Sequence, residues 1–498
     1  MSSETSSQKK AAKHLSIYAV GTVIRQLASF IMLPIYTTYL TPADYGAIAL
    51  LGFMAALTEL FLGIRMAQAV PKFYYEDKDP AYRRTVVSTT LIITSLASTL
   101  ASYSLYLLAP SISDILFGTG EYTLHVQIYS VVVLTSAIES YALMFFRLQE
   151  KPLLFMCLSL AKLITQLSLN IYFVVYLKME ALGVVYASII AAAIFSLSTG
   201  LYVIGKTGLK INTLLLPRLL SFCWPLWLEG FAGLYIGSAN RYFIRYFSDL
   251  TQVGLFELAS KFAIILIVLV WDPFSQWWQT ERFKLYNSPD KGKETFPSVF
   301  NGTLMILGLF ALGLNLFSEL VIQFVSSEAF SDSGKIIPIL TLATFFTCLY
   351  NFFRFSFFAT EKTIFATYIN YAAAIVATVL YILLIPYYGS LGAALATLST
   401  QFIVLTGGYY IAKNYAFDTN IRLGIFFRVT CLIILFSYID AFISDLSTNL
   451  LIKFFTKIML VLFYLYVCLR LCQHDPVLER LKNNMMTFLR GKTMFLKR

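Results

Sequence analysis

The chain contains about fourteen apolar stretches, each long enough to cross a lipid bilayer. A membrane-spanning helix needs about 20 mainly apolar residues, because the hydrocarbon core is roughly 30 Å thick. The strict alternation of polar and apolar residues that is typical of membrane barrel strands is absent. Of the 498 residues, 58% are hydrophobic and 13% are charged. The sequence therefore predicts an all-α integral membrane protein, whose helices satisfy their backbone hydrogen bonds internally.

The predicted spans are placed by these apolar stretches. They lie near residues 15–40, 46–70, 85–108, 123–146, 153–177, 182–204, 219–247, 252–273, 296–317, 335–358, 364–385, 390–411, 423–441 and 449–470. The first span follows a short polar and basic start and is not closed by a small-residue cleavage site. We interpret it as an uncleaved signal anchor.

The basic residues that give the chain its net charge of +11 lie mainly on one predicted side of the membrane. With the N-terminus inside, the inner loops and tails hold about 25 Lys and Arg and the outer loops about one, Lys178. The basic residues thus indicate topology rather than a nucleic-acid partner, and both termini are predicted to face the cytoplasm from the inner or plasma membrane. Lys453 and Lys457 lie toward the outer end of the last span, where we expect them to snorkel or the span to lie on the bundle surface.

The six cysteines lie in or beside apolar segments without paired spacing, which predicts buried thiols rather than a disulfide or metal framework. The sequence predicts no cofactor.

The chain carries a faint internal repeat with an offset of roughly 210 residues. Three pairs of segments carry it: Pro42–Ile48 with Leu250–Phe256, Arg147–Lys151 with Phe358–Lys362, and Leu182–Ala187 with Leu391–Ala396. Because each half has six spans, an even number, both halves are predicted to have the same orientation in the membrane.

This repeat predicts the domain organisation. We expect an N-terminal lobe at 15–210, a C-terminal lobe at 211–414 and two extra spans at 415–471. A cytoplasmic tail at 1–14 and a basic cytoplasmic tail at 472–498 enclose them.

Several segments resemble the polysaccharide transporter family, the Wzx-like oligosaccharide flippases of the MOP superfamily. They are Tyr18–Gly21, Leu33–Gly46, Arg147–Pro152, Ser221–Trp227, Asn240–Ile244 and Val253–Phe256. In the fifth segment, family members commonly have an Asp-Arg pair where this chain has Asn240-Arg241. The resemblance covers the twelve repeated spans and is carried by the order and spacing of the segments together.

The resemblance implies two six-helix lobes that form a V around a central cavity, which opens alternately inward and outward. It implies a lipid-linked oligosaccharide as cargo, an undecaprenyl-pyrophosphate sugar unit moved from the cytoplasmic to the outer leaflet for a surface polysaccharide. Membrane lipids, a glycan polymerase and other assembly proteins would be the partners.

Independently of the family, basic residues lie within the apolar spans. Each would cost about 2.5–3.5 kcal/mol at mid-depth in lipid, so we expect packing to turn them toward a shared aqueous cavity. A cationic face suits a pyrophosphate group; the alternatives are interhelical pairing or snorkelling. On span five, Ser159, Lys162, Gln166 and Asn170 form a polar stripe at helical spacing. The predicted substrate-binding residues are Arg25, Arg65, Lys162, Lys261 and Arg354, with Arg241 near the outer end of span seven.

Carboxylates within the spans are candidates for ion coupling. Burial favours the protonated form of a carboxyl group, so such a group can bind H⁺ or Na⁺ in one state and release it in another. The alternative is partnership with a buried cation, as for Glu257 and Lys261 at i, i+4. The predicted ion-coupling residues are Glu59 and Glu229 in the first place, because both lie deep in helices expected to flank the cavity, followed by Glu139 and Asp272.

Other functional classes find less support in the sequence. Gly200–Thr207 matches the phosphate-loop pattern but finishes a membrane helix, so ATP binding is not predicted. A membrane-embedded glycan polymerase or ligase should present catalytic groups in a sizeable outer loop, whereas the longest one, about 318–334, is acidic without an evident catalytic set. The prediction is a transporter rather than an enzyme. A MATE-like multidrug or cation antiporter and a peptidoglycan-precursor flippase remain alternatives, and the sugar, the coupling ion and the oligomeric state stay open.

Overall fold

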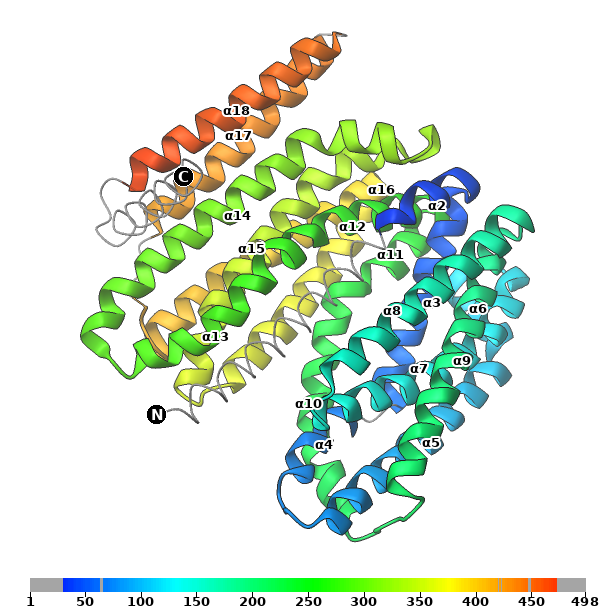
Figure 1. Cartoon of the computed structure of the whole chain (residues 1–498). Coiled ribbons are helices and arrows are strands. Elements are labelled where there is room, and N and C mark those ends of the chain that lie inside the picture. Colours follow the sequence, from blue (N-terminus) through cyan, green and yellow to red (C-terminus); the bar gives the residue numbers. More distant parts are fainter. Residues whose placement is uncertain (1–29, 63–65, 420, 422, 447–448, 473–498) are drawn as a thin grey trace, which may run out of the picture. The chain divides into compact units, whose positions relative to one another are not determined.

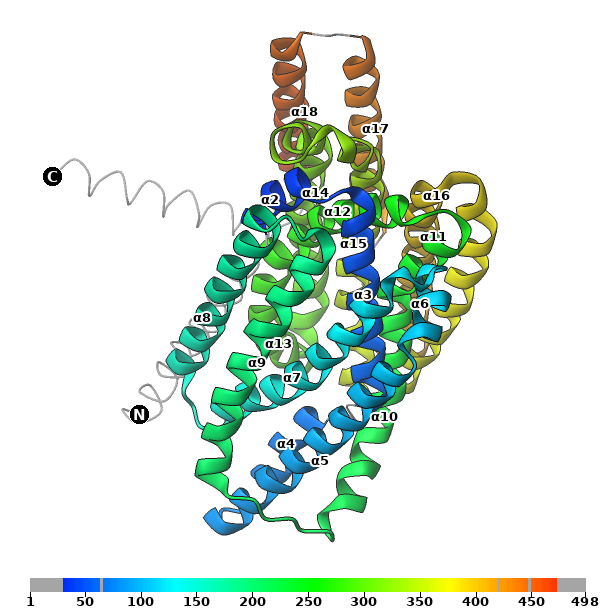
Figure 2. The ribbon, with the colours of Figure 1, turned by 90° about the vertical axis from the view of Figure 1, so that its right-hand side faces the viewer.

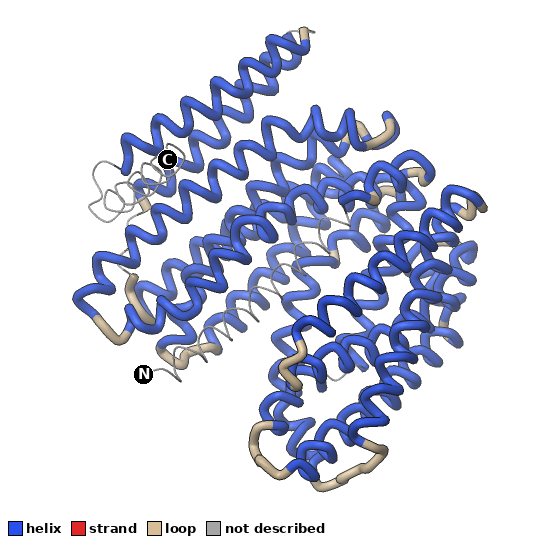
Figure 3. Tube along the Cα trace, viewed as in Figure 1, coloured by secondary structure: helices blue, strands red, loops and turns tan. Residues whose placement is uncertain are grey.

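The computed structural model describes residues 30–62, 66–419, 421, 423–446 and 449–472. Every regular element in these ranges is helical and none of their residues forms a strand (Figure 3). Within them, twelve helices are long and apolar enough to cross a membrane. The predicted class, an all-α membrane protein, is confirmed.

The described helices follow the predicted spans, with two complications. Helix α16 (Ile364–Tyr415) contains both predicted spans 364–385 and 390–411, which meet at a kink at Gly389. The backbone there has φ 55° and ψ −130°, a conformation that essentially only glycine adopts. The predicted first span lies mostly outside the described residues. The number fourteen therefore stays a prediction.

The chain divides into two compact units, each described here by itself. The first unit contains the described residues as far as Leu258, with Val325–Ser331 and Ala377–Ala393. Its helices are α2 (Leu33–Tyr39), α3 (Pro42–Leu62), α4 (Met66–Tyr74), α5 (Pro80–Leu107), α6 (Ala109–Phe117), α7 (Thr123–Leu148), α8 (Pro152–Asn170), α9 (Glu180–Thr207), α10 (Leu215–Ser238) and α11 (Asn240–Phe247), with the start of α12 (Leu250–Leu266). Figure 1 shows these α-helices. Short η1 (Gly120–Tyr122) and π-helical η2 (Ile171–Tyr176) lie among them along the chain.

The second unit comprises Ala259–Phe324, Asp332–Val376 and the described residues from Ala394 onward. It holds the rest of α12, π-helical η3 (Ile267–Trp271), α13 (Asp272–Tyr286), α14 (Pro289–Val325), α15 (Ser333–Ala359), most of α16, α17 (Gly424–Leu446) and α18 (Leu450–Cys472). Because α14 continues to Val325 and η4 (Glu328–Phe330) follows, the outer loop predicted at 318–334 is shorter than expected.

Helices α10 and α11, which open the predicted second lobe, belong to the first unit. The division into two six-helix lobes stays a prediction.

The first pair of repeated segments meets inside the first unit. A Cβ placed on Gly46 of α3 would overlap the carbonyl oxygen of Leu250, and one placed on Gly254 of α12 would overlap that of Pro42. In the repeat, Pro42 corresponds to Leu250 and Gly46 to Gly254. The contact is therefore the same when viewed from either helix, as in a local two-fold arrangement.

The other two repeated pairs share a backbone feature. Glu150 and Glu361 hold corresponding places in their loops and have φ values of 53° and 60°. Glu180 and Gly389 each lie two residues before the third repeated segment, with φ values of 51° and 55°. A positive φ is uncommon outside glycine. Its recurrence at equivalent positions supports the internal repeat.

The linker between α9 and α10 is fixed to α5. The Lys210 amide donates to Ser88 Oγ at 2.7 Å and the Asn212 amide donates to Thr89 Oγ1 at 2.9 Å. Beyond the linker, Leu215, Leu219 and Cys223 of α10 pack in one buried cluster with residues of α4 and α5. The start of α10 is thus held beside α4 and α5, as Figures 1 and 2 show.

The hairpin of α17 and α18 contains a buried ion pair. Lys457 has no exposed surface, and its Nζ lies 2.8 Å and 2.6 Å from the two carboxylate oxygens of Asp440 and 2.6 Å from the carbonyl oxygen of Leu316. Of the two expectations for Lys457, snorkelling is therefore wrong, whereas a last span on the bundle surface fits the exposed apolar side chains of α18. Three acceptors compensate the loss of hydration, so this lysine attaches α18 to α17 and α14.

Candidate functional site

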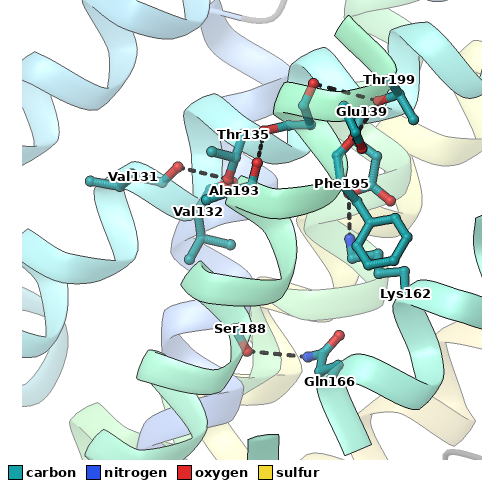
Figure 4. A network of polar contacts seen from close by, with 12 residues as sticks. Val131, Val132, Thr135, Glu139, Lys162, Gln166, Ser188, Ala193, Phe195 and Thr199 are labelled. Atoms are coloured by element: carbon teal, nitrogen blue, oxygen red, sulfur yellow. Dashed lines mark hydrogen bonds and ion pairs between the residues drawn. The ribbon is translucent and has the colours of Figure 1, made fainter. Parts of the chain in front are cut away.

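Two residues predicted for different roles meet in the first unit. Lys162 of α8 was expected to bind substrate and Glu139 of α7 to couple an ion. Lys162 Nζ lies 2.5 Å from Glu139 Oε2, and the side chains are 25% and 9% exposed (Figure 4). A charged pair at this depth avoids the cost of leaving either group alone among apolar helices.

The sequence of α8 explains how Lys162 reaches this place. Ser159, Lys162, Gln166 and Asn170 recur at three- and four-residue spacing and so share one face of the helix. Gln166 Nε2 donates to Ser188 Oγ of α9 at 3.2 Å, which fixes that face toward α9 as well as α7 (Figure 4). The polar stripe predicted from the sequence therefore contacts the neighbouring helices α7 and α9.

The Lys162–Glu139 pair lines a cavity of about 380 Å³, which we name the α7–α8 cavity. Its lining consists of Met32, Tyr36, Glu139, Leu143, Ser159, Lys162, Leu163, Gln166, Leu167 and Asn170. Ser159 Oγ and Asn170 Oδ1 are buried there without a hydrogen-bond partner in the described part of the chain. An unsatisfied buried polar atom costs about 1–3 kcal/mol, so this cavity is chemically suited to water, an ion or a polar ligand.

Glu59 lines a second cavity of about 330 Å³ between α3, α4, α5 and α7. Gln68, Ser140 and Thr94 are among its polar neighbours, and Thr94 Oγ1 has no hydrogen-bond partner within the described ranges. The side chain of Glu59 is exposed. Glu59 therefore faces solvent as well as the cavity.

Arg241 of α11 binds Glu257 of α12. Its Nη2 and Nε lie 2.7 Å and 2.8 Å from Glu257 Oε2, and both side chains are largely buried. An arginine that donates two hydrogen bonds to one carboxylate is held firmly by it. Its neighbour Arg245 donates from Nε to the carbonyl oxygen of Phe117 at 2.5 Å, at the C-terminus of α6, where a cation is favourable.

The remaining predicted residues are distributed over both units. Lys261 of α12, Arg354 of α15 and Asp272, the first residue of α13, are partly buried in the second unit. The Arg354 guanidinium lies 5.4 Å from the centre of the Phe358 ring. Arg25, Arg65 and the side chain of Glu229 lie outside the described residues.

Sequence reasoning missed two features. Asp440 and Lys457 lie at similar distances on either side of the α17–α18 turn, so a hairpin would have brought them together. For Lys72 and Arg218 the sequence predicts only a topological role, although a cavity of about 550 Å³ brings them together. No set of three or more His, Cys, Asp or Glu side chains in the described ranges is arranged to hold a metal ion.

Comparison with known proteins agrees with this architecture. A family model described as "Polysaccharide biosynthesis protein" matches residues 11–276. No curated protein sequence matches the chain. Among solved structures, the chain is similar to the lipid II flippase MurJ in its inward closed conformation, with a TM-score of 0.70, 16% identity, and coverage of 91% of this chain and 98% of that chain.

Two other solved structures are also similar. An inward-facing multidrug resistance MATE family transporter of the MOP superfamily has a TM-score of 0.60 and 13% identity, over 78% of this chain and 97% of that one. A mutant of the Vibrio cholerae MATE transporter VcmN has a TM-score of 0.52 and 16% identity, over 83% and 98%. At such identities the similarity concerns the fold, which is that of the MOP-type transporters.

Proposed function

This chain belongs to the polysaccharide biosynthesis protein family, and from this premise we propose that it is a flippase for a lipid-linked oligosaccharide. The cargo is an undecaprenyl-pyrophosphate sugar unit, carried from the cytoplasmic to the outer leaflet by alternating access. Membership of the family carries the proposal. The similarity of fold to MurJ, which is a lipid II flippase, supports a lipid-linked cargo.

The charged groups within the spans support a polar cargo. Arg25, Arg65, Lys162, Lys261 and Arg354 remain our candidates for contacts with pyrophosphate, because arginine and lysine are its preferred partners in proteins. Arg241 is the weakest member of this set, since it already binds Glu257. It would have to exchange that carboxylate for phosphate during transport.

We further propose that transport is coupled to H⁺ or Na⁺ through a carboxylate. Glu139 is favoured over Glu59, Glu229 and Asp272 because it lines a cavity together with a cation and two unsatisfied polar atoms. Binding of a cation by Glu139 would weaken its attraction to Lys162 and release the lysine toward the cavity. The pair would thereby link ion binding to a change in helix packing.

The first experiment is deletion of the gene. We expect lipid-linked glycan to accumulate in the inner leaflet and surface polysaccharide to disappear, as measured by gel analysis of extracted surface glycan. Re-expression of Arg25→Ala or Arg65→Ala should restore about tenfold less glycan than the native chain at equal protein level, because each loses a charge-assisted contact. Lys13→Ala, in the N-terminal tail, is the matched control.

The antiporter alternative makes the opposite prediction. A multidrug or cation antiporter would leave surface glycan intact on deletion and would increase sensitivity to cationic drugs. Normal surface glycan in the deletion strain would therefore contradict the flippase proposal.

A further inference from the structure

A cavity of about 550 Å³ lies where α4 ends and α10 begins. Six residues line it: Lys72, Phe73, Pro217, Arg218, Ser221 and Phe222. The flanking loops contain Lys78 and Lys210, and the last turn of α9 contains Lys206, so the distribution of basic residues assigns this end of the helices to the cytoplasmic side. We name these six residues the α4–α10 niche.

The niche has a rigid base. Phe73 is buried in the cluster that joins Met66 and Ala69 of α4 to Leu219 and Cys223 of α10. The linker that precedes α10 is hydrogen-bonded to α5 on the other side. The positions of Lys72 and Arg218 are therefore set by packed helices rather than by a loop.

Lys72 is held over aromatic rings. Its Nζ lies 4.3 Å from the centre of the Phe222 ring and 5.5 Å from that of Phe73. Lys72 has no salt-bridge contact within 4 Å among the described residues, although its charge acts on nearby Glu76. A cation over an aromatic face is positioned while its outer side stays free to bind an anion.

Arg218 also lines the niche, and it forms an exposed ion pair with Glu76. Its guanidinium lies 5.5 Å from the centre of the Phe73 ring, and its Nη2 lies 2.6 Å from Glu76 Oε1. The two side chains are 55% and 42% exposed. Exposed ion pairs contribute little to stability and exchange readily, so an anion of higher charge could displace Glu76.

Two cations, the Ser221 hydroxyl and two phenyl rings match the chemistry of one kind of ligand. A phosphate or pyrophosphate needs cationic and hydroxyl donors, while the first carbons of a lipid chain attached to it need apolar contacts. A free anion would gain nothing from the rings. The combination therefore indicates a phosphate group that is attached to a lipid.

We propose that the α4–α10 niche binds the phosphate end of a membrane lipid on the cytoplasmic side, and that this lipid is the polyprenyl pyrophosphate cargo before it enters the translocation pathway. Glu76 occupies Arg218 while the niche is empty and is displaced by the ligand. This assignment rests on the proposed function. An anionic phospholipid headgroup has the same phosphate chemistry and is the competing source.

The hydrogen bond from Arg218 lowers the pKa of Glu76 below its ordinary value. Glu76 is therefore ionised at neutral pH and competes with phosphate for Arg218. Replacing it with a neutral isostere removes that competitor but not the cations. A site that binds phosphate should then bind it more tightly, which a purely structural ion pair would not do.

Binding to the purified full-length protein tests the proposal with two probes. The first is farnesyl pyrophosphate, titrated in detergent, and the second is vesicles of phosphatidylcholine with or without phosphatidylglycerol. Lys72→Gln should weaken farnesyl pyrophosphate binding about tenfold, as expected for loss of one charge-assisted contact. Glu76→Gln should strengthen it several-fold, about threefold or more. Lys78→Gln, in the loop outside the niche, should leave it unchanged.

The binding measurements on these variants can contradict the proposal in two ways. If Lys72→Gln and Glu76→Gln leave binding of both probes unchanged, the niche is not a phosphate site. If they alter only the binding of phosphatidylglycerol vesicles, the ligand is a phospholipid headgroup and the assignment to the cargo is overturned. The proposed function is tested separately, since loss of surface glycan on gene deletion does not depend on Lys72.

Discussion

At the scale of single residues, this protein uses charge in two ways. Lys162 and Glu139 are mostly buried and satisfy each other at 2.5 Å beside a cavity. Arg218 and Glu76 are exposed at the end of a helix, and their pair is easily exchanged. The first pair is costly to break because it leaves a charge in an apolar environment. The second is suited to opening when an anion arrives.

The buried pair leads to a prediction about stability. Lys162→Met and Glu139→Gln should each lower the melting temperature in detergent, because each leaves one charged or polar partner unsatisfied. The double variant should lose less stability than the sum of the losses in the two single variants. The expected coupling energy is about 1–2 kcal/mol, as is usual for residues in contact. Thermal unfolding of the four proteins completes the cycle.

Ser168→Ala is the matched control for that cycle. Ser168 lies exposed on the same helix, outside the cavity lining, and its substitution should leave the melting temperature unchanged. Additive effects of the two charge variants would show that the contact contributes nothing to stability.

At the scale of the helices, small residues determine how closely elements approach. Gly46 of α3 and Gly254 of α12 bring each helix backbone against the start of the other. Close approach through small residues is a common way for membrane helices to associate, because lipid supplies no hydrophobic drive between them. At Gly389, the kinked backbone is further held by Gln252 Oε1, which accepts hydrogen bonds from the Ser390 amide at 3.1 Å and from Ser390 Oγ at 2.5 Å.

A larger side chain at the crossing should force the helices apart. We expect Gly46→Val or Gly254→Val to destabilise the protein by about 1–3 kcal/mol, as overpacking usually does. Gly52→Ala on the same helix is the control, because an added Cβ there meets nothing within 4 Å. The yield of monodisperse protein and its melting temperature are the measurements, and equal stability of all three variants would contradict the role of this crossing.

At the scale of the whole molecule, the chain passes repeatedly between its two compact units. The first unit contains most of the first half and takes Val325–Ser331 and Ala377–Ala393 from the second. These segments make specific contacts within it: Thr37 Oγ1 donates to the Val325 carbonyl oxygen at 3.1 Å, and Tyr235 and Thr378 share a hydrogen bond of 2.6 Å. Segments from distant parts of the sequence therefore pack together in the first unit.

The orientation of the whole chain in the membrane can also be predicted. The excess of Lys and Arg in one set of loops predicts that both termini are cytoplasmic. A fluorescent reporter that matures only in the cytoplasm should be active when fused after Arg498, whereas alkaline phosphatase fused there should be inactive. The same reporters placed after Lys178, in a predicted outer loop, should give the reverse result, and equal signals at both sites would contradict the topology.

Much of the fold could be predicted from the sequence. The spans from 85–108 onward coincide with helices, and the polar stripe from Ser159 to Asn170 does line a cavity. The partners of the buried charges could not be predicted in the same way. Glu257 binds Arg241 of another helix, a partner that the sequence does not indicate. Snorkelling, one of the two outcomes expected for Lys457, does not occur, because this lysine is buried against Asp440.

This difference has a physical origin. A bilayer requires each spanning segment to satisfy its own backbone and to present apolar side chains over a fixed length, so the class, the spans and the expected orientation depend on local sequence alone. Which charges meet depends on how each helix is rotated, kinked and packed, and several distant segments decide that together. Only the tertiary structure could therefore bring Lys162 to Glu139, Gly46 to the start of α12, and Lys72 beside Arg218 in one niche.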